Sequence, residues 1–460
     1  MYTCTPFRKY MHRFTSSVTG AVLAVVMVAG QAPVSSASTR QSETGTVTTL
    51  SYVLQGPLAG PALTEYKDLA KAFHLQYPSL QVQFVPESLQ QLLTTRLTSV
   101  RSNAAPDMIY WPVGPGYGQT AAIQAGLLAN LTPLYNKYGW FSDLPASIEG
   151  EEVHGRIYNI DGSMGGQPYV FYNENIFNKL HIAVPHTGSE MIRVAKQLSH
   201  SSYLPLVMAG VLQGQDVTLA SILIERYLSL AAYKSLTDSG NLGVKAATSW
   251  MSPGVLAAFT TLHNWAAAGL FYSGDGSLSA LEATSLFESG KAAMLSANIG
   301  FMTPAVIAKY IGARFKVGMF EYPKLDPQVP TYQNVSVANS EFSVPETAWK
   351  KEKAAITDWI VFYMSVTARK IILTEGNALP DDVQGIPRAA ISKAIGPFQT
   401  TMLRWIRRYG SEQNLDGWVA PQLRDALGNA VLGIINGGTT PQSATASLQA
   451  VAVALRKGQV

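Results

Sequence analysis

Histidine pairs are the first feature to look for, because two histidines four residues apart on a helix can hold a zinc ion. None of the seven histidines stands in such a pair, and the single cysteine, Cys4, lies close to the N-terminus. The glycine-rich segment 114–118 (GPGYG) differs from a phosphate-binding loop, because Pro115 has no N–H to offer and no lysine follows. The residues therefore predict no metal and no cofactor.

Carboxylate pairs are the other route to catalysis, since glycoside hydrolysis needs two facing acids. The adjacent acids at 151–152 and 381–382 cannot grip one bond together, because neighbouring side chains diverge on a strand or a helix. Acids distant in sequence but close in the fold are left open, so a secreted glycoside hydrolase is kept as an alternative. Without a recognisable nucleophile, metal or cofactor motif, a protein that is not an enzyme is favoured.

The N-terminus has the pattern of a secretory signal. Arg8, Lys9 and Arg13 precede an uncharged run at 18–30 (VTGAVLAVVMVAG), and small residues at 35–37 suit cleavage near Ala37. The run is too short to span a bilayer, although retention as an anchor is the alternative. Cleavage leaves 31 basic against 30 acidic residues, so no nucleic-acid partner is expected. We expect an extracytoplasmic protein, either periplasmic or secreted to the cell surface.

The chain that follows is long enough, at 460 residues with 47% hydrophobic side chains, for two or three domains. Apolar runs at 48–54, 80–85 and 108–111 predict strands separated by single helices, which indicates parallel βαβ units and an α/β fold. A helix-rich region follows, in which Thr187 with Glu190 and Ser279 with Glu282 form capping boxes. Strands return at 315–319 and 334–344.

Strand-rich and helix-rich stretches thus alternate, as expected if the chain crosses between two lobes. The division predicted is a signal peptide at 1–37, a linker at 38–47, an N-terminal lobe at 48–163 plus 313–370, and a C-terminal lobe at 164–312 plus 371–460. Crossing segments are expected at 163–168, 310–315 and 367–379, where glycines suit a hinge.

Short motifs in a fixed order carry a family resemblance from about Val47 to the C-terminus. They are Pro106–Trp111, Ala125–Pro133, Gly155–Tyr158 with Tyr172–Phe177, Val184–Thr187, Phe287–Met294, Gly376–Pro380 and Thr440–Ala444. In this order the chain resembles the extracellular solute-binding proteins of ABC importers, in the carbohydrate-binding group that includes maltose-binding protein.

The resemblance implies a type II periplasmic-binding-protein-like fold with the ligand cleft between two lobes. It also implies a monomer that binds a sugar there and delivers it to the permease subunits of an ABC transporter. A same-fold protein for a polyol phosphate, a peptide or a polyamine is the alternative. A phosphate would call for two or more arginines or lysines in the cleft. Since Arg388 is the only basic residue expected near the cleft mouth, an anionic ligand is not favoured.

Trp111 occupies the aromatic position of the family, at the carboxyl end of the third strand, where α/β sheets place ligands. The alternative is a core tryptophan under the next helix, as expected for Trp265. Amides and aromatic residues replace the charged partners that maltose-binding protein carries near the ligand. The other ligand-binding residues expected are Glu87, Gln55, Tyr117, Gln167, Tyr169, Gln215, Asn298, Phe301 and Arg388.

Overall fold

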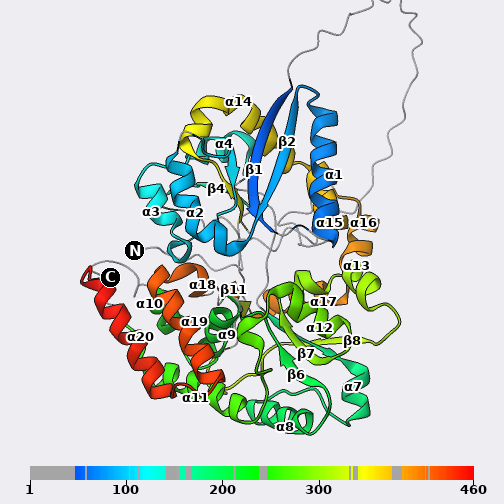
Figure 1. Ribbon diagram of the computed structural model, residues 1–460, viewed down its shortest axis with the longest axis vertical. Helices are drawn as coiled ribbons and strands as arrows, with labels where there is room; N and C mark the ends of the chain where they lie inside the picture. The colour runs from blue at the N-terminus through cyan, green and yellow to red at the C-terminus, as the bar shows by residue number, and fades with distance from the viewer. Residues whose placement is uncertain are drawn as a thin grey trace, which may run out of the picture. The chain divides into compact units, whose positions relative to one another are not determined.

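Two β-sheets, each with its own helices, organise the chain from Thr48 to Val460 in the computed structural model (Figure 1). Residues 1–47 form a separate unit, of which only Val47 is described, so the expected signal peptide lies outside the described residues. The structure describes residues 47–56, 58, 60–102, 104–111, 114–140, 153, 155–161, 168–210, 214–237, 246–330, 333–334, 340–375, 386–409, 411–412 and 415–459.

The first sheet has the strand order β2-β1-β3-β10-β4. Its strands are β1 (Thr48–Gln55), β2 (Leu80–Glu87), β3 (Met108–Ile109), β4 (Asn159–Asp161) and β10 (Ser340–Ser343). β1 runs parallel to β2 and β3, as the βαβ pattern predicted, whereas β10 is antiparallel to both of its neighbours. The carboxyl ends of β1, β2 and β3 therefore meet at one edge of the sheet.

Helices cover this sheet with an aromatic core. The ring of Phe73 lies 5.0 Å from that of Trp359, and Tyr52 of β1 lies 5.1 Å from Phe342 of β10. In Figure 1, α1 runs beside β2. The helices of this lobe are α1 (Gly60–Gln76), α2 (Leu89–Arg101), α3 (Gln119–Gln124), α4 (Thr132–Tyr138), α14 (Glu346–Tyr363) and α15 (Val366–Glu375), with the 3₁₀ turn η3 (Pro115–Tyr117) before α3.

The second sheet has the order β6-β7-β5-β8, from β5 (Tyr169–Asn173), β6 (Leu204–Val207), β7 (Ala292–Ala297) and β8 (Val317–Phe320). Every residue of β7 is buried, as in a strand covered on both faces. Both predicted capping boxes are confirmed, at the starts of α8 (Gly188–Ser199) and α12 (Ala280–Glu288). Trp265 is buried and donates to the Gly188 carbonyl at 3.1 Å, which confirms its predicted core position.

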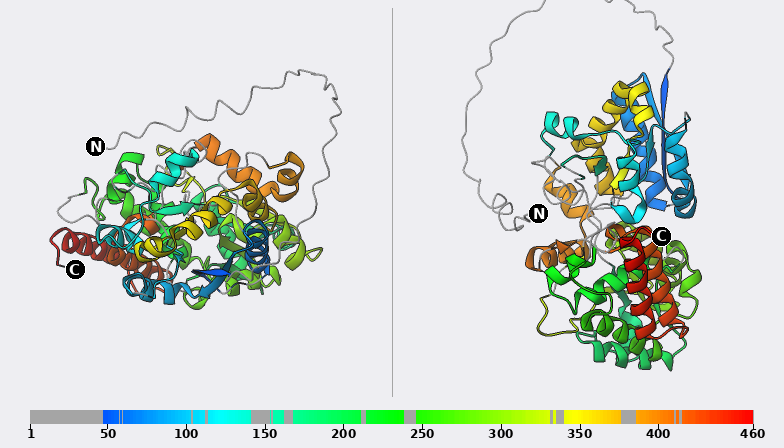
Figure 2. Two further views of the ribbon diagram at one scale, coloured as in Figure 1. Left: turned by 90° about the horizontal axis from the view of Figure 1, so that it is seen from above. Right: turned by 90° about the vertical axis from the view of Figure 1, so that its left-hand side faces the viewer.

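The remaining elements complete the second lobe and the short connections. Helices α19 and α20 lie side by side, as the orange-red and red ribbons show in Figure 2; α19 packs on α9 and α11, and α20 packs on α11. These elements are α7 (Glu174–Lys179), α9 (Gly214–Glu225), α10 (Leu230–Thr237), α11 (Pro253–Ala267), η5 (Asp275–Ser277), η6 (Ile299–Met302), α13 (Pro304–Val306), η7 (Ile307–Ile311), β9 (Gln333–Asn334), α16 (Arg388–Ala394), α17 (Pro397–Tyr409), β11 (Ser411–Glu412), α18 (Leu415–Trp418), α19 (Pro421–Ile435) and α20 (Pro441–Arg456).

Two of the predicted lobe boundaries are wrong. β8 was expected in the N-terminal lobe, but it pairs antiparallel with β5 in the second sheet, since hydrogen bonding rather than position in the chain decides which sheet a strand joins. A boundary at 370 falls inside α15, which is one continuous helix that packs on α1. Of the crossing segments expected at 163–168 and 367–379, residues 163–167 and 376–379 lie outside the described residues.

Among the described helices, none is both long and apolar enough to cross a membrane.

Candidate functional site

Three of the expected site residues lie at the carboxyl edge of the first sheet. Gln55 ends β1 and pairs in register with Glu87, which ends β2. Trp111 follows β3 by two residues. The parallel arrangement of these strands brings the three residues to one edge, because parallel strands end on the same side.

Trp111 packs there as a core residue. Only 1% of it is exposed, and it belongs to a small apolar cluster with Leu92, Ile109 and Ile123. Its Nε1 donates to the Tyr117 carbonyl at 2.9 Å, and the Arg96 guanidinium carbon lies 5.0 Å from its ring centroid. The ring of Trp111 thus has the position of a core tryptophan, which was the alternative to a ligand-binding residue.

The turn after Trp111 is held by buried amides. Gln119 donates to the side chain of Asn159, which in turn donates to the Trp111 carbonyl at 3.3 Å. The Gly114 amide donates to Gln119 Oε1 at 3.4 Å. These bonds fix the path of η3 and carry the side chain of Tyr117 away from the first sheet.

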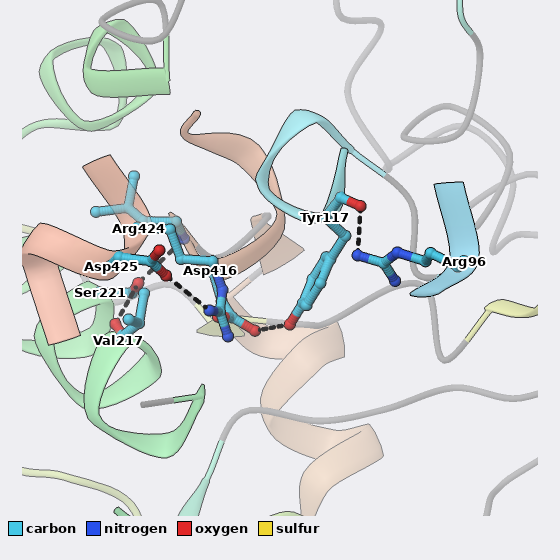
Figure 3. A network of polar contacts seen from close by, with 8 residues as sticks. Arg96, Tyr117, Val217, Ser221, Asp416, Arg424 and Asp425 are labelled. Atoms are coloured by element: carbon cyan, nitrogen blue, oxygen red, sulfur yellow. Dashed lines mark hydrogen bonds and ion pairs between the residues drawn. The ribbon is translucent and has the colours of Figure 1, made fainter. Parts of the chain in front are cut away.

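Tyr117 reaches a helix of the other lobe (Figure 3). Its hydroxyl donates to Asp416 Oδ2 on α18, and Arg424 Nε on α19 donates to Asp416 Oδ1 at 2.8 Å. On the other side of Tyr117, Arg96 of α2 donates to its carbonyl oxygen. We call Arg96, Tyr117, Asp416 and Arg424 the cross-lobe cluster.

The backbones of the two lobes touch beside this cluster. A Cβ atom added to Gly116 would lie 2.4 Å from the Asp416 carbonyl oxygen, and one added to Gly114 would lie 2.1 Å from that of Gly417. Gly114 also has a φ of 104°, a conformation that side chains disfavour. Glycine is therefore required for η3 to approach α18 this closely.

Burial sets the protonation of the cluster. Burial, followed by the charge of Asp416, raises the pKa of Tyr117 well above its ordinary value, so the phenol is neutral. Burial lowers the pKa of Arg96 to about 10, which still leaves the guanidinium charged at neutral pH. Burial also acts to lower the pKa of Arg424, but Asp416 and Tyr117 outweigh that effect and raise it. The cluster thus holds two cations and the Asp416 carboxylate.

The second sheet contributes three expected residues at the matching edge. Tyr169 begins β5 opposite Ala297, the last residue of β7, so the half-buried Asn298 and Phe301 follow at the same edge. Tyr169 is buried, and its ring lies 5.4 Å from that of Trp405. Gln167 and the side chain of Arg388 lie outside the described residues.

Helix α9 and the turn η5 each contribute one acid to a buried pair, Asp216 and Asp275. Gln215 is half-buried, and Asp216 lies within the first turn of α9 rather than at its N-cap. Asp216 is 0% exposed and Asp275 is 1% exposed. Burial raises the pKa of each acid to about 8, and the neighbouring Asp275 adds to the shift of Asp216.

Arg96, Asp416 and Arg424 were not predicted from the sequence. Arg96 stands between the buried residues Leu92 and Val100 at four-residue spacing, and Arg424 stands within the apolar stripe of α19. A charged residue on the buried face of a helix is the signal that could have identified both arginines.

The two sheets and their helices define a two-lobed α/β protein. A family model described as bacterial extracellular solute-binding protein matches residues 60–370, and the chain belongs to this family. A curated relative, an uncharacterized ABC transporter extracellular-binding protein from Pyrococcus horikoshii, is 22% identical over 43% of this chain. The match spans 44% of the length of that relative.

Solved structures share the fold along most of the chain. One, from work on xylan utilization by the thermophilic bacterium Caldanaerobius polysaccharolyticus, has a TM-score of 0.73 at 19% identity, covering 88% of this chain and 100% of the other. A chitin oligosaccharide binding protein has a TM-score of 0.72 at 19% identity, and the match covers 89% of this chain and 100% of the other. A maltose-bound protein of T. maritima has a TM-score of 0.70 at 17% identity, and the match covers 88% of this chain and 99% of the other. The TM-scores show a common fold, and at identities this low the likeness concerns the fold alone.

Proposed function

We propose that this protein is the extracytoplasmic substrate-binding subunit of a carbohydrate ABC transporter. The family match over residues 60–370 carries the proposal, and the fold shared with proteins described as binding chitin oligosaccharide and maltose supports a saccharide ligand. The protein binds a sugar between its lobes and delivers it to a membrane permease. It is a monomer without catalytic activity, exported by a signal peptide that is cleaved near Ala37.

The ligand lies between the two sheet edges. From the first lobe, Gln55 and Glu87 offer polar groups to hydroxyls, and Tyr117 offers an aromatic ring. From the second lobe, Asn298 and Phe301 offer an amide and a ring, while Tyr169 and Gln215 line the edge behind them. Planar polar groups satisfy sugar hydroxyls and rings cover the apolar faces of a pyranose, so this composition suits a saccharide.

A thermal-shift screen of the purified secreted protein against mono- and oligosaccharides tests the proposal. A ligand at 100 times its Kd adds about 2.7 kcal/mol to the stability of the native state, which raises the midpoint measurably. Replacing Asn298 by Ala should lower the shift, whereas Gln90→Ala, at an exposed position of α2, should leave it unchanged. A panel in which no saccharide raises the midpoint would contradict the proposal.

A further inference from the structure

The cross-lobe cluster contains two buried arginines that come from different lobes. Arg96 of α2 is 3% exposed and Arg424 of α19 is 4% exposed. Their guanidinium carbons lie 5.8 Å and 5.0 Å from the ring centroid of Tyr117. Figure 3 shows Tyr117 between the two arginines. Neither arginine was among the basic residues expected at the cleft.

The positive charge of this cluster exceeds its negative charge. Asp416, with 13% of its side chain exposed, forms an ion pair with Arg424 at 2.8 Å. Asp425 lies 3.5 Å from Arg424, but 63% of its side chain is exposed, so water screens it. In the described part of the chain no carboxylate forms an ion pair with Arg96. Among the described residues, one buried cation therefore has no buried counter-ion, and a ligand that supplies one would offset the cost of burying that charge.

The hydrogen-bonding groups without a partner in this cluster are also cationic, since both are guanidinium nitrogens. Arg96 Nη1 and Arg424 Nη2 are both buried, and neither has a partner among the described residues. Guanidinium nitrogens only donate, so each of these atoms can still bond to an acceptor that a ligand supplies. Two unused donors beside an unbalanced positive charge match an anionic acceptor better than a neutral hydroxyl, because charge-assisted hydrogen bonds are the stronger kind.

We propose that the cross-lobe cluster binds an anionic group of the transported solute, so that the ligand is an acidic saccharide rather than a neutral one. A carboxylate, as in a uronic acid, or a phosphate, as in a sugar phosphate, meets the requirement. This assignment rests on the proposed function and names the class of sugar. It departs from the expectation against an anionic ligand, because the fold brings together two arginines of the kind that such a ligand calls for.

Binding would join the lobes through charge. The anion accepts hydrogen bonds from the unused Nη atoms of Arg96 and Arg424, one from each lobe, and its charge compensates the excess cation. Asp416 keeps its bonds to Tyr117 and Arg424, so the phenol and the second guanidinium stay oriented. An acidic ligand thereby favours the arrangement in which η3 contacts α18, whereas a neutral sugar leaves the excess charge in place.

Calorimetric titration of the full secreted protein with matched pairs of sugars tests this assignment. The probes are galacturonate against galactose and glucuronate against glucose, as monomers and trimers, with the 6-phosphates of both hexoses and inorganic phosphate as further arms. We expect at least one acid to bind about 10- to 100-fold more tightly than its neutral partner, equal to about 1.4 to 2.8 kcal/mol. The carboxylate and phosphate arms identify which anion is preferred.

Variants separate charge from structure. Arg96→Gln should abolish the preference for the acid, so that the acid and its neutral partner bind with similar affinity. Arg96→Lys keeps the positive charge but lacks the paired N–H donors of the guanidinium, so it should retain part of the preference for the acid. This variant tests the proposal even if the glutamine variant folds poorly. Arg101→Gln, at an exposed position of the same helix, is the matched control and should behave like the unmodified protein.

The outcomes distinguish this assignment from the proposed function. Neutral sugars that bind as tightly as their acids, or a preference that survives in Arg96→Gln, would overturn the anion site and leave the carbohydrate function standing. Inorganic phosphate that binds as tightly as every sugar phosphate would support the anion site and overturn the carbohydrate function. Binding of none of these probes would overturn both.

Discussion

Replacing Asp216 by Asn should stabilise the protein at neutral pH. Asp216 is fully buried, neither of its carboxylate oxygens has a hydrogen-bond partner among the described residues, and burial raises its pKa to about 8. The acid that faces it is Asp275, one of whose oxygens accepts the Met208 amide at 3.1 Å while the other has no partner among the described residues. Tyr322, next to Asp275, stays neutral because burial raises its pKa.

The magnitude follows from the two protonation states. An aspartate with an ordinary pKa of 3.8 is ionised in the unfolded chain at pH 7, whereas the folded protein keeps Asp216 protonated. The difference of about 3 units between pH 7 and the ordinary pKa, at 1.36 kcal/mol per unit, sets the upper limit of the free-energy cost. Protonating and burying Asp216 at pH 7 thus costs at most about 4 kcal/mol. Asparagine needs no proton and can donate to Asp275. We expect a gain of about 1 to 4 kcal/mol at pH 7.

The pH dependence has a definite sign. The folded state binds the proton of Asp216 more tightly than the unfolded state does. The stabilisation of the folded protein by this proton is therefore fully present below about pH 4 and is lost as pH rises toward 8. Urea melts at pH 5, 6, 7 and 8 should therefore show the gain from Asp216→Asn growing with pH. Asp68→Asn, a substitution in α1 of the other lobe, serves as control. A constant difference between the variant and the unmodified protein across this range, or a variant less stable at pH 8, would refute the reasoning.

Three further predictions follow from the packing and from the sequence. Trp111→Ala should destabilise the native state by about 3 to 5 kcal/mol in urea melts, because it empties a buried site; an unchanged midpoint with lost sugar binding would instead place the ring in the cleft. Gly116→Ala should weaken ligand binding at least about 10-fold in calorimetry, since its Cβ would lie 2.4 Å from the Asp416 carbonyl oxygen and separate η3 from α18; normal affinity would show that this contact does not matter for binding. Intact-mass measurement of the secreted protein should give a chain that begins near Ser38, whereas retention of Arg8 to Arg13 would indicate an anchor.

The helices and the parallel part of the first sheet could be predicted because their signals are local. Thr187 and Ser279 accept a hydrogen bond from the amide three residues on, so a capping box is complete within four residues. A single helix was predicted between the strands at 80–85 and 108–111, and α2 lies there; the strand predicted at 80–85 begins β2 at Leu80. The motif order along the chain likewise indicated the family that the model match establishes.

The assignment of β8 could not be predicted in the same way. Phe315 to Met319 has the composition of a strand, but the choice between the two sheets depends on hydrogen bonds to β5, almost 150 residues earlier in the chain. The boundary predicted at 370 fails for a related reason, since nothing in the local sequence of α15 shows that it packs on α1.

The sequence by itself determined the class of protein, the capped helix starts and the places of the first three strands in the chain, because these depend on residues close together in the chain. Only the tertiary structure decided that Trp111 is buried, that Asp216 and Asp275 face each other and that Arg96, Tyr117, Asp416 and Arg424 meet. Arg96 and Arg424 are more than 300 residues apart. The charge and hydrogen-bonding capacity of a site built from such distant residues arise from packing, which a local pattern of amino acids does not encode.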